Sequence, residues 1–209
     1  MVSIDRQLSI NKSTQVCFKC ILDSSDDPDI QFDKHGVCNH CRIYDEVVKK
    51  EVYSGKKGEE KLKQLVERIK KDGNNKKYDC LVGISGGVDS TYVAYLCKKI
   101  GLRPLAVHLD NGWNSELAVK NIENILDKLD IDLETYVIDW EEFKDLQLSY
   151  LKASVVDIEA TTDHAIFASL YKTAAQYGIK YIINGLNIVT EGYLPSHWVH
   201  NKFDLMNIK

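Results

Sequence analysis

The sequence predicts an α/β domain, in which helices cover both faces of a parallel sheet, preceded by a small cysteine-rich module. Two observations support this. From Cys80 onward, short apolar runs alternate with helical patterns, and strands separated by helices form parallel sheets that are buried on both faces. In contrast, four of the six cysteines lie between residues 13 and 45, a segment too short to bury a core of its own.

The composition is that of an ordinary globular protein. The chain has 209 residues and 28% charged residues, which suits one domain with a small appendage. A net charge of -4 argues against a general polyanion binder. No apolar run approaches the roughly 20 residues that span a bilayer. The first residues lack the basic-then-apolar pattern of a signal peptide. We therefore expect a cytoplasmic protein with reduced cysteines and no membrane partner.

Three segments are expected along the chain. Residues 1–45 form the cysteine module, residues 46–77 a charged helical connector, and residues 78–209 the main domain. The connector carries an apolar stripe at helical spacing, which consists of Leu62, Leu65, Val66 and Ile69.

Four strands, separated by helices, are expected in the main domain. Strands are expected at 80–84, 105–109, 136–138 and 181–183. Apolar spacing predicts helices near residues 93–100, 122–129, 143–150 and 161–177. We expect Asn114 or Ser115 to cap the second of these helices. Thr161 or Thr162 should cap the last helix, and Gly178 should end it.

A glycine-rich loop joins the first strand to the first of these helices. Its sequence is Ser85-Gly86-Gly87-Val88-Asp89-Ser90. Free N–H groups at a helix N-terminus attract anions, and adjacent glycines let phosphate oxygens approach the backbone. The loop therefore predicts a phosphate site.

Two other interpretations of the loop fit less well. A Walker A loop requires a glycine and a lysine where this chain has Val88 and Asp89. The run Gly83–Gly87 matches the nucleophile elbow of hydrolases, with Ser85 as nucleophile, but several strands should precede such an elbow and none is expected here. A glycine-rich turn without a ligand is the remaining alternative.

The loop resembles the PP-loop of the ATP pyrophosphatases, whose pattern S-G-G-x-D-S it matches completely. The resemblance implies that residues 85–90 bind the pyrophosphate part of ATP, with Ser85, Asp89 and Ser90 as catalytic residues. A substrate oxygen then attacks the exposed α-phosphate, and pyrophosphate leaves with Mg²⁺.

Three further polar residues are candidates for the same site. Asp110 ends the second strand, where open sheets bind ligands, and lies near the nucleotide or Mg²⁺ in this interpretation. A turn role before Asn111 fits it equally well. Asn187 and Glu191 follow the fourth strand at the same edge. Glu191 is a candidate Mg²⁺ ligand or a solvated loop residue.

The cysteine module predicts a structural metal site. Cys17 and Cys20 are separated by 17 residues from Cys38 and Cys41, and two such C-x-x-C pairs are typical of a tetrahedral zinc site. An iron–sulfur cluster is the alternative.

The nearby histidines and the two other cysteines have simpler interpretations. We interpret His35 and His40 as exposed loop residues rather than ligands. Cys80 and Cys97 lie on apolar faces and are interpreted as small buried hydrophobic residues.

Taken together, the cysteine module and the loop resemble the N-acetyl sugar amidotransferases of bacterial surface-polysaccharide pathways. The likeness covers residues 17–41, 83–90, 108–114 and 162–187. It implies a cytoplasmic ligase that adenylates the acetamido oxygen of a nucleotide-linked N-acetyl sugar, with ammonia then displacing AMP to give an amidine. It also implies that a glutaminase supplies the ammonia through a cyclase-like subunit. Members of this family are longer, so we expect a C-terminally truncated catalytic domain.

A tRNA-modifying enzyme of the same superfamily is the alternative. Residues 49–77 carry eleven lysines or arginines and only five acidic residues, and a basic patch can bind phosphates. A solvated helix face explains the same charges, and the neighbouring cysteine module is acidic. We therefore do not expect a nucleic-acid partner.

Overall fold

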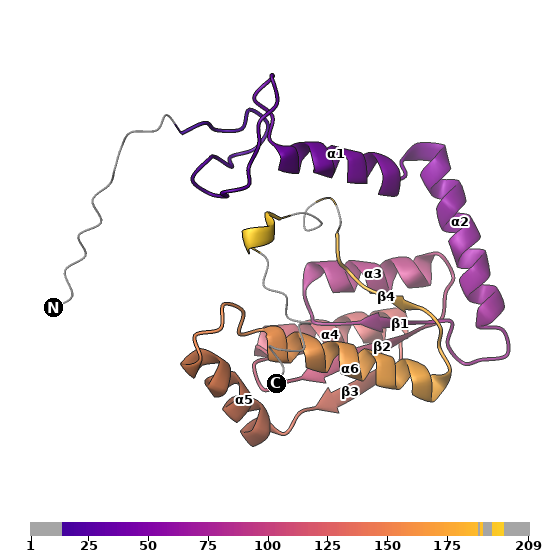
Figure 1. Ribbon diagram of the computed structural model, residues 1–209. Coiled ribbons are helices and arrows are strands. Elements are labelled where there is room, and N and C mark those ends of the chain that lie inside the picture. Colours follow the sequence, from indigo (N-terminus) through magenta and orange to yellow (C-terminus); the bar gives the residue numbers. More distant parts are fainter. Residues whose placement is uncertain (1–13, 188, 190–193, 199–209) are drawn as a thin grey trace. The chain divides into compact units, whose positions relative to one another are not determined.

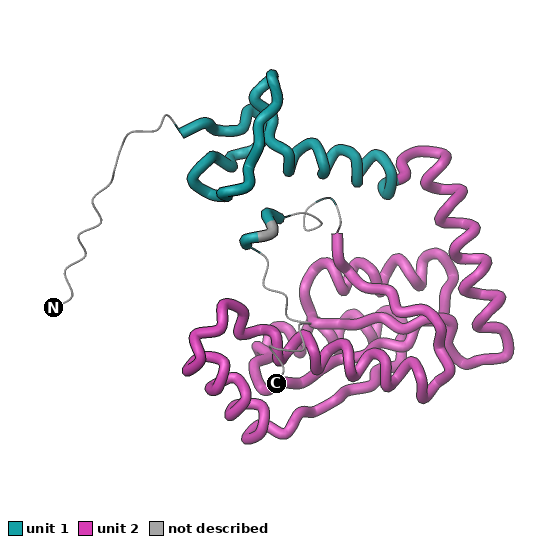
Figure 2. Tube along the Cα trace, in the orientation of Figure 1, with its two compact units in different colours: residues 1–52, 188–199 teal, residues 53–187, 200–209 magenta. Residues whose placement is uncertain are grey.

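The computed structural model describes residues 14–187, 189 and 194–198, which form two compact units (Figure 2). The first unit contains the described residues of Met1–Val52 and Ile188–Val199, and the second those of Tyr53–Asn187. The boundary at residues 52 and 53 falls inside the segment expected as a connector, and the chain after Asn187 returns to the first unit. In the part of the chain that the structure describes, no helix has the length and apolarity needed to cross a membrane.

The first unit contains little regular structure. It consists of α1 (Asn39–Glu51), the 3-10 turn η1 (Ser196–Trp198) and two isolated antiparallel bridges. Its buried apolar cluster is built on three cysteines, against which Cys20 and a few apolar side chains pack. Phe18 and Ile21 stay exposed. Apolar burial in this unit is therefore small.

The second unit contains a four-stranded parallel sheet in the order β3-β2-β1-β4. Its strands are β1 (Cys80–Gly83), β2 (Pro104–Asp110), β3 (Leu133–Val137) and β4 (Ile182–Ile183). Its helices are α2 (Gly55–Asp72), α3 (Val88–Lys99), α4 (Glu116–Leu129), α5 (Trp140–Lys152) and α6 (Ala160–Tyr177).

Helices cover both faces of this sheet, as the sequence predicted. Alternate residues of a strand point to opposite faces. Cys80 and Val82 therefore pack with α2, α3 and α4 in one cluster, whereas Leu81 packs with Leu170 of α6 in a second. Figure 1 shows α3 and α6 on opposite sides of the sheet. The predicted α/β class is confirmed.

Most of the predicted helix ends are confirmed, with one exception. The Ser115 hydroxyl accepts the Ala118 N–H at 3.2 Å as the cap of α4, and Gly178 ends α6 in the left-handed region. The prediction that Thr161 or Thr162 caps α6 is wrong, because the helix already begins at Ala160. An earlier turn at Asp157, whose carboxylate accepts the Glu159 N–H, starts the helix before the threonines.

The third strand begins earlier than predicted. Apolar content suggested residues 136–138, but β3 starts at Leu133. As an edge strand it is hydrogen-bonded only to β2 and its residues are alternately exposed and half-buried. Polar residues therefore fit into it, and apolar content alone did not find them.

Candidate functional site

The glycine-rich loop leaves the central strand β1 and enters the N-terminus of α3. Gly87 is the N-cap residue of α3, and it has no side chain to occupy the first-turn N–H groups. Ser85 and Asp89 are exposed beside them. The loop therefore presents backbone donors and two polar side chains to solvent, an arrangement that suits an anion.

Gly86 is required by close packing as well as by backbone conformation. Its φ is +77°, and a Cβ at this position would lie 2.4 Å from the carbonyl oxygen of Ala118 in α4. The Asn121 side chain of the same helix donates to the Gly86 carbonyl oxygen at 3.3 Å. Helix α4 thus holds the loop in place from one side.

The two serines of the loop hydrogen-bond to each other. Their hydroxyl oxygens are 3.2 Å apart, and the Ser85 N–H donates to the Ser90 hydroxyl at 3.2 Å. The Ser90 hydroxyl also donates to the Gly87 carbonyl at 3.2 Å. These contacts preorganise the loop, and the exposed Ser85 hydroxyl can turn toward a ligand.

A cavity of about 510 Å³ opens beside the loop between α3 and α4. Its wall includes Gly86 and Gly87 from the loop and Lys128 from α4. The Lys128 ammonium adds positive charge to a groove that already contains backbone donors. The groove is large enough for part of a nucleotide.

Asp110 lies at the carboxyl end of β2, next to the strand that carries the loop. Its carboxylate accepts the Gly112 N–H and the Asn114 side-chain amide, both at 3.0 Å. This is the turn role that the sequence left open. The second carboxylate oxygen and the position at the sheet edge remain compatible with a role near a nucleotide.

His108 is a residue of the site that sequence reasoning did not assign. It is buried, its Nδ1 donates to the Ile84 carbonyl at 2.9 Å, and Asn114 donates to its Nε2 at 3.2 Å. It therefore connects the last residue before the loop to the turn after β2. The available signal was a histidine within an otherwise apolar strand.

The chain after β4 passes against the start of α3. A Cβ on Gly185 would lie 3.2 Å from Asp89 Cβ and 3.3 Å from the Ser90 nitrogen. Asn187, two residues further on, is exposed. Glu191, the candidate Mg²⁺ ligand, lies outside the described residues. The structure thus brings the loop, Asp110 and the segment leading to Asn187 to one edge of the sheet.

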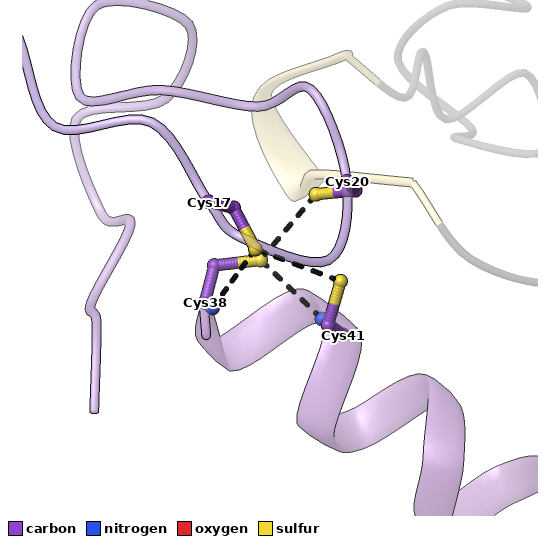
Figure 3. A group of neighbouring side chains, drawn as sticks. All are labelled: Cys17, Cys20, Cys38 and Cys41. Atoms are coloured by element: carbon purple, nitrogen blue, oxygen red, sulfur yellow. Dashed lines mark hydrogen bonds between the residues drawn. The ribbon is translucent and has the colours of Figure 1, made fainter. Parts of the chain in front are cut away.

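In the first unit, the four predicted metal ligands converge (Figure 3). Cys38 and Cys41 lie at the start of α1, and Cys17 and Cys20 come from the loop before it. The Sγ atoms of Cys17 and Cys41 are 3.9 Å apart, and those of Cys20 and Cys38 are 3.8 Å apart. Zinc–sulfur bonds of about 2.3 Å in a tetrahedron place sulfurs about 3.8 Å apart. The residues therefore fit zinc.

The pKa values of three of these thiols are shifted in opposite directions. Burial alone would raise the pKa of Cys17, but backbone N–H groups of Cys38, Lys19 and Cys20 outweigh it and lower the pKa to about 6. Burial raises the pKa of Cys20 and of Cys41. The backbone thus stabilises the Cys17 thiolate, and a bound metal ion would favour the ionised forms of Cys20 and Cys41.

One histidine prediction near this site is wrong. His40 is buried within α1 and its Nε2 lies 2.5 Å from Oδ2 of the buried Asp27, whereas His35 is exposed as expected. His197 of η1 lies 2.7 Å from Asp29. This Asp–His network connects α1 and η1 to the loop between the cysteine pairs, and it depends on contacts that the sequence pattern did not reveal.

Comparison with known proteins identifies a family and several relatives. The sequence pattern of the family described as NAD synthase matches residues 59–190. The chain is 36% identical over 70 residues to tRNA(Ile)-lysidine synthase of Chlamydia pneumoniae, covering 32% of this chain and 22% of that protein. It is 30% identical over 129 residues to tRNA-specific 2-thiouridylase MnmA of Clostridioides difficile, covering 53% and 35%. The chain thus spans about a third or less of the length of the curated relatives it matches.

Two solved structures are similar at lower identity. NH3-dependent NAD synthetase of Campylobacter jejuni superposes with a TM-score of 0.45 and 18% identity, covering 60% of this chain and 55% of that one. Glutamine-dependent NAD+ synthetase of Acinetobacter baumannii gives a TM-score of 0.49 and 15% identity, covering 76% and 30%.

Proposed function

This chain belongs to the NAD synthase family, and from that premise we propose that it uses ATP to transfer AMP to a substrate oxygen. Ammonia then forms a C–N bond at the activated carbon. The observation that carries the proposal is the exposed loop at residues 85–90. It places free N–H groups of α3 at the carboxyl edge of a parallel sheet, where such sheets bind nucleotides.

In this proposal the loop holds the two outer phosphates of ATP. The first-turn N–H groups of α3 and the Ser85 hydroxyl donate to phosphate oxygens, and the Ser90 hydroxyl does so once it turns away from the Gly87 carbonyl. This leaves the α-phosphate open to attack. The carboxylates of Asp89 and Asp110 are the candidate Mg²⁺ ligands among the described residues. When bound, Mg²⁺ neutralises charge on the leaving pyrophosphate.

The proposed acceptor is a nucleotide-linked N-acetyl sugar. Its acetamido oxygen attacks the α-phosphorus, and pyrophosphate leaves. Ammonia adds to the activated carbon, AMP departs with the former carbonyl oxygen, and loss of a proton gives the acetamidino sugar. The resemblance of the cysteine module and loop to the sugar amidotransferases supports this acceptor. We also propose that a partner glutaminase and a cyclase-like subunit deliver the ammonia.

Modification of tRNA is the second candidate. Two curated relatives are tRNA-modifying enzymes by name, and α2 carries exposed lysines. Base adenylation followed by amination or thiolation would use the same loop. The acidic residues between the cysteine pairs oppose binding of a polyanion.

Product analysis separates these candidates. The protein is incubated with α-labelled ATP, Mg²⁺ and ammonium, and with either nucleotide-linked N-acetyl sugars or bulk tRNA. We expect AMP and pyrophosphate to form only with a sugar, together with an amidine product detected by mass spectrometry. AMP formation that requires tRNA would establish the second candidate, and ADP with phosphate would contradict the proposed role of the loop.

A further inference from the structure

A second cavity, separate from the glycine-rich loop, lies between α5 and α6. Its volume is about 540 Å³, which is in the range of small-molecule sites. One face of α5 and the first turns of α6 form its walls. The lining residues are Ile138, Asp139, Glu142, Phe143, Leu146, Tyr150, Thr161, His164 and Ala165.

The cavity is at the same edge of the sheet as the phosphate loop. Ile138 directly follows β3, and its N–H donates to the Asp110 carbonyl at the end of β2. β2 in turn is the neighbour of β1, which carries the loop. Two strand spacings of about 4.8 Å place the ends of β3 and β1 about 10 Å apart. A sugar ring in the cavity is therefore within reach of a nucleotide on the loop.

The turn after β2 is fastened to α5, the helix that lines the cavity. The Trp113 indole N–H donates to the buried Gln147 side chain at 2.7 Å. The Trp113 and Trp140 rings meet edge to face with centroids 5.5 Å apart. These contacts join the turn after Asp110 to α5, the helix that forms one wall of the cavity.

The chemistry of the lining selects the kind of ligand. Phe143, Leu146 and Ala165 give an apolar wall that suits a methyl group or the face of a sugar ring. Glu142 and Tyr150 offer hydrogen-bonding groups to a ligand. The Asp139 carboxylate instead caps α5, because it accepts the N–H groups of Glu141 and Glu142. The described residues that line the cavity include no lysine or arginine. An anionic diphosphate is therefore disfavoured, and an uncharged ring with hydroxyl and amide groups is favoured.

We propose that this cavity binds the acetamido-sugar ring of the acceptor, with the sugar's diphosphate outside it. The acetamido methyl packs on the apolar wall, and Glu142 accepts hydrogen bonds from the ring. This inference rests on the proposed sugar-amidating function and assigns it an acceptor pocket.

Calorimetric titration tests the pocket. The full chain is titrated with UDP-N-acetylglucosamine, UDP-N-acetylgalactosamine, UDP-glucose and UDP, with Mg²⁺ and α,β-methylene-ATP present to prevent turnover. We expect at least one acetamido sugar to bind more tightly than UDP-glucose and UDP. Ala165→Leu, which fills the cavity, should weaken that binding by about tenfold, and Glu142→Gln by about threefold to tenfold.

Matched controls change exposed neighbours outside the lining. Ala168→Leu on α6 and Glu141→Gln on α5 should leave sugar affinity within about twofold, and all four variants should keep their affinity for α,β-methylene-ATP. Sugar binding that is equal in all variants, or equal for UDP and the acetamido sugars, overturns the pocket while leaving the proposed function intact. A wild-type protein that binds α,β-methylene-ATP but no acetamido sugar also overturns the pocket. If AMP forms only with tRNA, the proposed function fails as well.

Discussion

The two units of this chain differ in what is buried inside each of them. The first unit buries mainly cysteine side chains around a predicted metal site, and large apolar residues such as Phe18 and Ile21 stay in solvent. The second unit buries two apolar clusters, one on each face of its sheet. Because apolar burial in the first unit is small, we predict that it needs a metal ion in order to fold, whereas the second unit can be stable through apolar burial.

Removal of the metal should have the largest effect and should be confined to the first unit. Structural zinc contributes about 10–16 kcal/mol to the folding of small modules, more than the apolar burial there can replace. We expect a strong chelator, or Cys38→Ser, to unfold residues 14–51 while the sheet stays intact. Hydrogen exchange with mass spectrometry measures both regions. Cys97→Ser, in the second unit, is the control that should keep the metal content unchanged.

Truncation of a core residue of the sheet should destabilise the second unit and leave the first unit unchanged. Leu105 of β2 is 1% exposed and packs in the apolar cluster between the sheet and α6. Leu105→Ala should destabilise the second unit by about 2–5 kcal/mol, because it removes buried methyl groups and leaves a cavity. Urea unfolding followed by circular dichroism measures this change. Loss of metal from the same variant would show that the two units do not fold independently.

A change in the phosphate loop should separate activity from structure. Asp89 is exposed at the start of α3, so its replacement leaves no buried defect. Asp89→Ala should reduce AMP formation by about a hundredfold to a thousandfold, because it removes a candidate ligand of the Mg²⁺ that would neutralise charge on the leaving pyrophosphate. Metal content and the unfolding midpoint should stay at wild-type values. Unchanged AMP formation would remove Asp89 from the site.

A smaller effect is expected from the ion pair between Asp79 and Arg103. Burial would raise the pKa of Asp79, but hydrogen bonds from the Arg103 side chain and N–H lower it below its usual range. Arg103 is half exposed but Asp79 is buried, so Arg103→Gln, which keeps only the backbone N–H as a donor to Asp79, should destabilise the second unit by about 1–3 kcal/mol. In the wild type, the ionised Asp79 contributes to the stability of the second unit above pH about 4, the usual carboxylate pKa. This contribution is lost as the pH falls through the lowered pKa of Asp79. The difference between wild type and variant in urea midpoint should therefore shrink in acid.

The smallest effect is expected within the first unit, where η1 contacts the loop between the two cysteine pairs. A hydrogen bond to Asp29 raises the pKa of His197, and the Trp198 indole donates to the Asp26 carbonyl at 3.0 Å. A raised histidine pKa stabilises the contact fully below pH about 6.5, the usual histidine value. That contribution is lost as the pH rises through the raised pKa. Trp198 fluorescence, in a variant with Trp113 and Trp140 replaced by Phe, should change over this range. His197→Gln should abolish the change.

The sequence predicted those features that depend on neighbouring residues. The alternation of strands and helices, the Ser115 cap and the Gly178 stop are local patterns, and all are confirmed. The predicted start of α6 was wrong because a turn at Asp157 begins the helix before the threonines. The prediction for His40 was wrong because its partner Asp27 is not a neighbour in the sequence. Such partners become neighbours only after the chain has folded.

In the candidate site, too, the sequence predicted the local feature and not those that depend on packing. The loop at residues 85–90 is visible in the sequence because all its donors are contiguous. The histidine link from Ile84 through His108 to Asn114 depends on the register of β1 and β2. The cavity between α5 and α6 depends on how two helices pack. Neither follows from spacing along the chain.

The position of β1 in the middle of the sheet has a consequence for how a ligand affects the protein. The Leu81 amide of β1 donates to the Tyr181 carbonyl on one side, and the amide of Ile84, directly after β1, donates to the Val107 carbonyl of β2 on the other. Both amides should therefore exchange with solvent only when the whole sheet opens. A nucleotide bound to the loop on this strand would then slow exchange throughout the second unit. A thermal shift caused by ATP would accordingly report the global unfolding of that unit, and its size would follow from ligand concentration and affinity.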